Sequence, residues 1–313
     1  MKEIDNSLGK LDALLERENK FTEKKRNAIA ATQSGALTLS EDSLASLYEE
    51  KYTGRLVYAH KLGKWYVYDP KTGAWRADTM ERVQHWIREF VRHLNSEQRE
   101  KWAKASIVSA VDQYCRRAPA MARSGDEFDA DPWLLGTPSG VLDLRTSTMQ
   151  PKSPDHYVSK RTSVSPCASK PKIWLKFLKQ ATGDRKELID YLQRLAGYCL
   201  TGETREEMLA FMYGLGGNGK GVFMNTLRDV MGEYARQAPM QIFLASKSDR
   251  HSTDLASLAG ARLVLASESP EGRSWDEERI KSWLCSQIML LDRFTDRHSQ
   301  PLLGFRSIAF FTV

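Results

Sequence analysis

The stretch that decides the fold of this 313-residue chain is EEMLAFMYGLGGNGKGVFMNTLRDVMGEY, residues 206–234. It contains MLAFMY (208–213), an apolar run of strand length, followed by the glycine-rich sequence G-L-G-G-N-G-K (214–220). VFMNTLRDVM (222–231) then has helical spacing, and Gly232 fits as the C-terminal stop of that helix. The order of strand, glycine loop and helix predicts a phosphate-binding turn.

The physical reason lies in what a glycine loop exposes. Its successive backbone N–H groups can surround a phosphate chain, where side chains would block the approach. The following helix directs its positive end at the same phosphates, and Lys220 can reach the β- and γ-phosphates. This is the P-loop pattern G-x-x-x-x-G-K, although Gly221 stands where the full pattern has a Ser or Thr that binds Mg²⁺. A glycine-rich turn before an ordinary helix is the alternative interpretation.

A second apolar run, ARLVLAS (261–267), reads as a buried strand that leads to Glu268. An acid at the C-terminal end of a strand beside the strand of the loop can hold Mg²⁺ and polarise the attacking water. Ligands in open α/β sheets collect at that edge. A strand followed by Glu is common on its own, so this argument depends on the loop, and Glu271 is a nearby alternative carboxylate.

Upstream of the loop, helical patterns alternate with short strands. WYVYD–PKTG–AWRAD (65–78) is typical of a β-hairpin, in which aromatic and β-branched residues flank a Pro/Gly turn. Its aromatic side chains could stack on nucleic-acid bases, but aromatics in a small sheet are more often core, which we favour. These side chains are Trp65, Tyr66, Tyr68 and Trp75. Helices are expected at 39–52 with Ser40 as N-cap, 80–94, 96–117, 171–181 and 184–200.

The composition bounds the class of protein. A hydrophobic fraction of 41% and a charged fraction of 27% are ordinary for a soluble globular chain, and no run of apolar residues is long enough to span a membrane. The four cysteines form no C-x-x-C pair, which favours reduced thiols in the cytoplasm over a zinc site or disulfides. The net charge of +6 suits a polyanion such as DNA, although an ordinary solvated surface would look the same.

Several segments together resemble a known family. GLGGNGKGVFMNTLRDVMGEYA, LASLAGARLVLASESPEG and DEERIK are similar to the superfamily 3 helicase domain of phage and plasmid primase–helicase proteins. FDADPWLLGTPSGVLDLRT and LIDYLQRLAGYCLTGETREEMLAFMYG resemble the helicase-associated segment that precedes this ATPase. The resemblance covers roughly residues 40–282 and implies an AAA+-like core that hydrolyses ATP with Mg²⁺. It also implies assembly into a homo-oligomeric ring, usually a hexamer, that moves along single-stranded DNA.

The resemblance assigns roles to individual residues. Lys220 and Glu268 would be catalytic, and Glu268 would also hold Mg²⁺. Lys281 falls where the DNA-facing segment of the family begins, but an exposed lysine on a helix is an equal alternative. The expected ATP-binding residues are Gly214, Leu215, Gly216, Gly217, Asn218, Gly219, Lys220 and Gly221.

The likeness fades after residues 280–282, and neither a sensor Asn nor an arginine finger can be placed after that point. We therefore hypothesise an altered tail from about residue 283 on a truncated prophage gene. The expected function is an ATP-dependent DNA helicase of phage or plasmid replication, in the cytoplasm of a bacterial host, with weak turnover. The alternatives are a nucleotide- or DNA-binding remnant without productive hydrolysis, and another P-loop ATPase such as an initiator or packaging ATPase.

The expected fold class is α/β. A mainly helical N-terminal region with a small β-hairpin precedes an incomplete AAA+-like P-loop NTPase core, a three-layer α/β structure. The expected domains are an extension (1–38), a helicase-associated domain (39–170), a helical connector (171–202) and a truncated ATPase core (203–313).

Overall fold

The structure is a computed structural model in which contacts divide the chain into two compact units. Among the described residues, the first unit comprises 40–71 and 75–128, and the second comprises 72–74 and the residues from 129 onward. The described residues are 40–94, 104–203, 205–206, 209–214, 217–239, 243, 258, 260–267, 276, 288–294 and 307–311.

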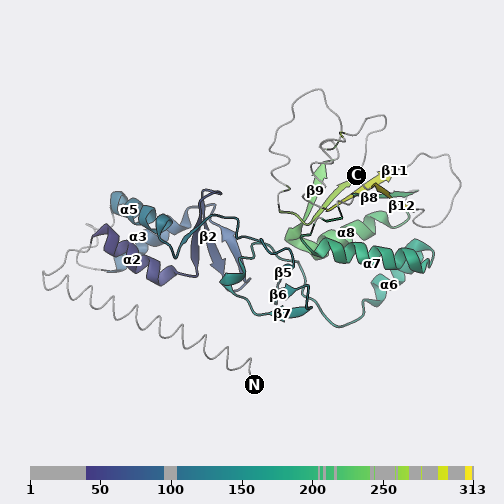
Figure 1. The fold of residues 1–313 in the computed structure, drawn as a ribbon, viewed down its shortest axis with the longest axis horizontal. Coiled ribbons are helices and arrows are strands. Elements are labelled where there is room, and N and C mark those ends of the chain that lie inside the picture. Colours follow the sequence, from purple (N-terminus) through teal and green to yellow (C-terminus); the bar gives the residue numbers. More distant parts are fainter. Residues whose placement is uncertain are drawn as a thin grey trace, which may run out of the picture. The chain divides into compact units, whose positions relative to one another are not determined.

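The first unit combines helices with a small sheet (Figure 1). Its described elements are α2 (Glu41–Tyr52), β1 (Leu56–Ala59), β2 (Lys64–Asp69), β3 (Ala74–Ala77), α3 (Arg82–Leu94), α5 (Ala105–Arg117) and β4 (Ala122–Arg123). The sheet has the order β3-β2-β1-β4, so the expected hairpin is confirmed as β2 and β3. The region therefore holds a four-stranded sheet, where the sequence indicated a hairpin beside helices.

The core of the first unit explains its local structure. Ser40 caps α2 as expected, because its side-chain oxygen accepts a hydrogen bond of 3.2 Å from the backbone N–H of Ser43. The apolar stripe of α3 is buried together with residues of α2 and α5. Trp65, Tyr68 and Trp75 are only 5%, 8% and 2% exposed, which confirms that these aromatics belong to the core.

The second unit begins with a three-stranded sheet, β5 (Leu134–Thr137), β6 (Gly140–Asp143) and β7 (Thr148–Gln150), followed by the short helix η1 (Pro154–His156). Next come α6 (Lys172–Thr182) and α7 (Lys186–Leu200), close to their expected bounds. Leu135 of β5 belongs to the same buried cluster as residues of α6 and α7. Residues 129–170 thus pack with the second unit, so the contacts divide the chain after Phe128, whereas the sequence analysis placed a boundary at 170.

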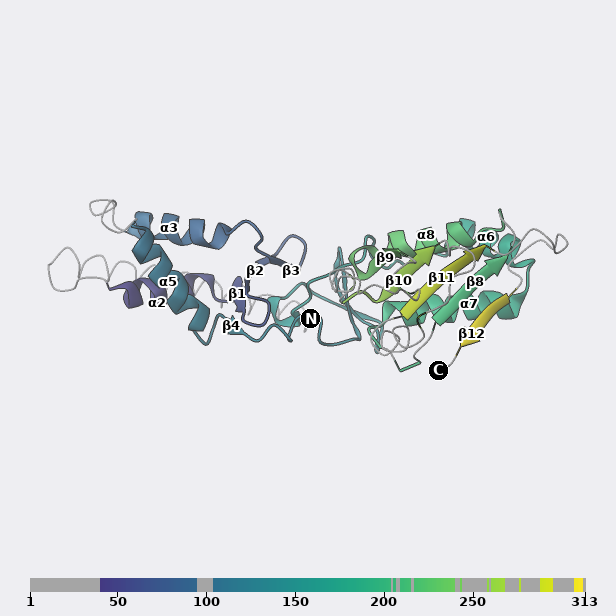
Figure 2. The ribbon, with the colours of Figure 1, turned by 90° about the horizontal axis from the view of Figure 1, so that it is seen from above.

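A five-stranded sheet forms the rest of the second unit (Figure 2). Its order is β12-β8-β11-β10-β9, with β12 antiparallel to β8 and the other neighbouring pairs parallel. The elements in chain order are β8 (Leu209–Gly214), α8 (Lys220–Met231), η2 (Gly232–Tyr234), β9 (Ala235–Pro239), β10 (Leu263–Ser267), β11 (Ile288–Phe294) and β12 (Ser307–Phe311). Both expected strands and the helix between them are confirmed.

One expectation about this sheet is wrong. The sequence analysis placed the strand before Glu268 beside the strand of the glycine loop, but β11 lies between them. β11 comes from the segment after residue 283, where the likeness to the family fades, so a local pattern could not reveal this pairing. The expected altered tail thus contributes two strands, β11 and β12, to the sheet.

The helices α6, α7 and α8 lie along one side of this sheet in Figure 1, and α8 contacts β9, β10 and β11. Two layers of the expected three are therefore present among the described elements. β10 is covered on both faces, because its neighbouring residues Leu263, Val264, Leu265 and Ala266 are all buried. This confirms that 261–267 contains a buried strand.

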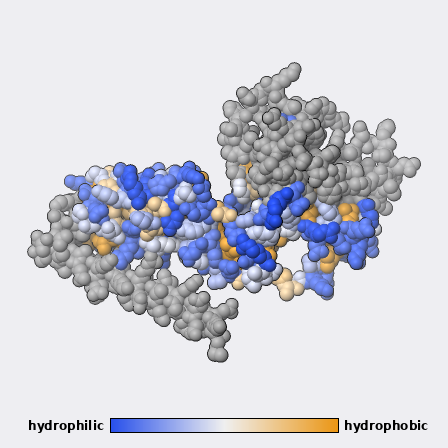
Figure 3. All heavy atoms as spheres, in the orientation of Figure 1, coloured by the Kyte–Doolittle hydropathy of each residue, from blue (hydrophilic) through white to orange (hydrophobic). Residues whose placement is uncertain are grey.

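Hydropathy was compared along the surface and along the helices of the chain. On the face drawn in Figure 3, the described surface of the first unit is mostly hydrophilic. In the part of the chain that the structure describes, no helix has the length and apolar character needed to cross a membrane.

Candidate nucleotide-binding site

The glycine loop joins the end of an interior strand of the sheet to the start of a helix. β8 ends at Gly214, and α8 begins at Lys220, two residues earlier than the spacing predicted. Gly217 and Gly219 have φ angles of 76° and 90°, which only glycine adopts readily. The second of these glycines is the N-cap of α8, so the left-handed turn allows the helix to begin directly at the lysine.

Gly219 and Gly221 differ in their surroundings. A Cβ atom placed on Gly219 would lie 3.0 Å from Cε2 of Phe177 and 3.3 Å from Cβ of Ala181, both on α6. A Cβ atom placed on Gly221 would meet no described heavy atom within 4 Å. The first glycine is therefore required by backbone angle and by packing, whereas the second leaves open space at the position where the full P-loop pattern has a hydroxyl.

Lys220 lies inside the turn and does not extend into solvent. It is only 4% exposed, and its ammonium donates a hydrogen bond of 3.0 Å to the side-chain oxygen of Asn218. The side-chain nitrogen of Asn218 is buried without a hydrogen-bond partner among the described residues. The side-chain oxygen of Asn218 also accepts a hydrogen bond of 3.5 Å from the backbone N–H of Lys220. The turn therefore brings an ammonium, the side-chain amide of Asn218 and the N-terminus of a helix together, which suits an anion such as a phosphate.

A small cavity of about 150 Å³ adjoins this turn. Gly221 of α8 and Leu265 and Ala266 of β10 contribute to its lining, so the first turn of the helix and the C-terminal end of β10 face the same space. The polar side chains in this lining are Asn225, Arg228 and Gln237, none of which belongs to the predicted site. The first two could have been found, since they lie four and seven residues after Gly221 on one face of a helix.

The structure brings together only part of the predicted site. Gly217, Asn218, Gly219, Lys220 and Gly221 form the turn, and the backbone of Gly214 ends β8. The other predicted site residues lie outside the described residues, namely Leu215, Gly216, Glu268 and Lys281, as does the alternative Glu271.

The described residues do not by themselves fit a Mg²⁺ site. Gly221 offers no hydroxyl, and the described lining of the cavity contains amide oxygens but no carboxylate. No group of three or more acidic, histidine or cysteine side chains converges anywhere in the described part of the chain. A metal here would depend on Glu268, the residue after the end of β10.

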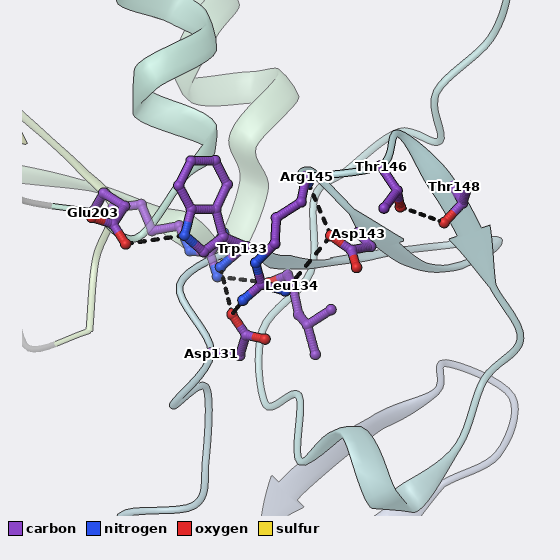
Figure 4. Close-up of polar contacts among 9 residues, drawn as sticks. Asp131, Trp133, Leu134, Asp143, Arg145, Thr146, Thr148 and Glu203 are labelled. Carbon is purple, nitrogen blue, oxygen red and sulfur yellow. Dashed lines mark hydrogen bonds and ion pairs between the residues drawn. The ribbon is translucent and has the colours of Figure 1, made fainter.

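A polar network shows what the segment FDADPWLLGTPSGVLDLRT builds (Figure 4). The indole N–H of Trp133 donates a hydrogen bond of 3.0 Å to the carboxylate of Glu203, just after α7. Arg145 donates to Asp131 at 2.6 Å, and its guanidinium lies 5.9 Å from the centre of the Trp133 ring. The network thus ties the three-stranded sheet to the polypeptide that leads into β8.

Comparisons with known proteins find a similarity in the N-terminal part of the chain. Residues 42–183 match the family model described as "D5 N terminal like". The matched segment covers α2 through α6 and includes Asp131, Trp133 and Arg145 of the network, whereas Glu203 lies outside it. It falls largely on the segment that the sequence analysis assigned to a helicase-associated domain.

A curated relative comes from Acanthamoeba polyphaga mimivirus and is named "Putative helicase L207/L206". It is 28% identical over 156 residues, which is 48% of this chain and 16% of the relative. The chain thus spans less than a fifth of the length of that protein.

Two solved structures of the NrS-1 C-terminal region, both described as apo, are also similar. One is 12% identical with a TM-score of 0.46, covering 80% of this chain and 56% of that chain. The other is 12% identical with a TM-score of 0.47, covering 82% and 58%. The chain spans less than two thirds of either, and a likeness at this level carries no argument about function.

Proposed function

We propose that the second unit binds ATP at the glycine loop, and that the chain is an ATP-dependent DNA helicase of phage or plasmid replication. The observation that carries the proposal is the turn at 217–221, where Lys220 begins α8 beside a cavity that β10 also lines. The D5 N-terminal-like region and the mimivirus relative named as a helicase support the wider assignment to replication.

The turn can bind a triphosphate through groups that are already in place. The backbone N–H groups of the first turn of α8 and the positive end of the helix would stabilise phosphate oxygens. The ammonium of Lys220 is buried, so solvent screens its interaction with phosphate less than it would at an exposed position. Binding would move this ammonium from the Asn218 oxygen to a phosphate oxygen.

Three further assignments belong to the proposal. Mg²⁺ would be held by Glu268, which would also orient the attacking water. Single-stranded DNA would be the polymer on which the chain moves, with Lys281 as a contact, and assembly into a ring would complete the site from a neighbouring subunit. The distance between strands supports the first assignment, because β8 and β10, with β11 between them, are roughly 10 Å apart at the same edge.

The test is ATP turnover by the full chain, measured with and without single-stranded DNA, together with binding of a fluorescent ATP analogue. Lys220→Ala should reduce analogue binding and abolish turnover, because it removes the ammonium of the turn. Lys176→Ala, at an exposed position on α6, is the matched control and should change neither. Analogue binding that is equal in both variants would refute the site.

The same assay separates a second candidate, a chain that binds nucleotide without productive hydrolysis. Gly221 favours this candidate, because the loop lacks the hydroxyl that P-loops use for Mg²⁺. Turnover that DNA stimulates supports the helicase, and binding without turnover supports the second candidate. Turnover that is indifferent to DNA would indicate another kind of P-loop ATPase.

A further inference from the structure

The first unit has an aromatic slot of its own, between the end of α2 and the exposed side of α3. The rings of Tyr52 and Trp86 lie nearly parallel, at 7°, with their centroids 6.5 Å apart. Both side chains are half-buried. They line a cavity of about 380 Å³ with Lys51, Glu89, Phe90 and His93. We propose that this slot, defined by these six residues, binds a base of single-stranded nucleic acid.

The ring geometry supports this choice of ligand. A centroid distance of 6.5 Å lies at the upper end of the range for ring pairs. Both rings line the cavity and lie nearly parallel, so a base that enters it can stack on an aromatic ring. Single-strand binding proteins use such aromatic platforms, because every base has a π-face.

The charges around the slot suit the phosphate that accompanies a base. The ammonium of Lys51 lies 5.3 Å from the centre of the Tyr52 ring and 5.4 Å from that of Phe90. α3 also carries Arg92, which pairs with Glu89 of the slot at 2.9 Å. That pairing lowers the pKa of Glu89, and the positive charge of Arg92 balances the negative charge of this carboxylate.

Glu49 and Glu50 precede Lys51 on α2, so the field at the slot is not uniformly positive. Stacking would therefore contribute more to binding than charge, and the affinity should depend only moderately on salt. Three other aromatics of the unit are occupied by contacts within it. Trp65 and Trp75 are buried in the core, and the ring of Tyr66 stacks on Phe128 at 4.3 Å.

The experiment measures binding of a labelled oligothymidylate to the full chain by anisotropy, with tryptophan fluorescence as a second readout. Trp86→Leu and Tyr52→Leu keep apolar contacts with the core but remove the ring faces. Each should weaken binding roughly 5- to 100-fold, because a stacked base is lost. Wild-type fluorescence should be quenched by the oligonucleotide, and Trp86→Leu should lose that quenching.

Tyr114→Leu is the matched control, because Tyr114 is an aromatic side chain of the same unit that is 49% exposed on α5. It should change the affinity less than twofold. Lys51→Gln should weaken binding and reduce the dependence of log affinity on log salt by about one. An abasic oligonucleotide and a duplex should bind more weakly than the single strand.

Circular dichroism checks that each variant is folded, and if Trp86→Leu does not fold, Tyr52→Leu and the wild-type quenching still decide. The proposal is overturned if the slot variants bind like Tyr114→Leu, or if the abasic strand binds as tightly as oligothymidylate. The proposal is independent of the nucleotide site, since a chain with Lys220→Ala should bind the oligonucleotide at this slot unchanged.

Discussion

Gly219 and Gly221 lie two positions apart in one turn, yet alanine should have opposite effects at the two positions. Gly219→Ala places a side chain at φ 90° and against Phe177. The free energy of unfolding should therefore fall by roughly 1–2 kcal/mol. Gly221→Ala enters open space in the first turn of α8 and should stabilise the fold by roughly 0.5–1 kcal/mol. Urea denaturation of both variants measures the difference, and equal shifts would contradict the geometry of the turn.

Arg262 is another residue whose role depends on its surroundings. It is 6% exposed, and its guanidinium donates hydrogen bonds to the backbone oxygens of Leu200 at 2.6 Å and Leu134 at 2.7 Å. Its centre also lies 4.4 Å from the centre of the Tyr234 ring. Burial lowers the pKa of Arg262, whereas Tyr234, Asp129 and Asp131 act in the opposite direction.

Arg262→Met should therefore lower the free energy of unfolding by roughly 2–4 kcal/mol, because two partly buried carbonyl groups lose their donor. The matched control is Arg236→Met, at an exposed position paired with Val264 on the neighbouring strand. This control should change the free energy by less than about 0.5 kcal/mol. Thermal or urea unfolding measures both, and equal losses would show that the buried hydrogen bonds do not matter.

At the scale of elements, α3 depends on a carboxylate that precedes it. The buried side chain of Asp78 accepts hydrogen bonds from the backbone N–H groups of Val83 at 2.8 Å and Met80 at 3.3 Å. Burial acts to raise the pKa of Asp78, but these bonds and those from Arg82 outweigh it, so the pKa lies below its usual 3.8.

A carboxyl whose pKa is lower in the folded chain stabilises the fold above its ordinary pKa. That stability should be lost as the pH falls from about 3.8 through the pKa of the folded state. Asp78→Asn should flatten the dependence of stability on pH in this window and leave a less stable α3 at pH 7. Circular dichroism melts from pH 2 to pH 7 measure this, and parallel curves for both proteins would contradict it.

The elements that could be predicted are those set by local pattern. The N-cap Ser40 of α2 and the apolar stripe of α3 each depend on residues that are close together in the sequence. Both predictions are confirmed. The same holds for the strand, loop and helix around Lys220. The pairing of β11 with β8 could not be predicted, because it joins segments that are far apart in the chain.

The candidate site was predictable to a similar extent. The glycines of the turn and Lys220 follow from a motif of seven residues. The burial of that lysine, its hydrogen bond to Asn218 and the packing of Gly219 on Phe177 depend on α6, an element that the motif does not contain. Gln237 reaches the cavity from β9, and no spacing in the sequence relates it to the loop.

At the scale of the whole molecule, each unit has its own buried cluster, and the two clusters share no residue. Scanning calorimetry of the full chain should therefore show two unfolding transitions. Asp78→Asn should lower the midpoint of one transition and Arg262→Met that of the other. A single transition that both variants shift equally would mean that the units unfold as one cooperative body.

The position of β8 has a consequence for folding during synthesis on the ribosome. The two neighbours of β8 in the sheet are β11 and β12, which are synthesised after α8, β9 and β10. Both strands that pair with β8 are therefore available only late in translation. A nascent chain stalled between β10 and β11 would carry the complete glycine motif, yet β8 would have neither neighbour.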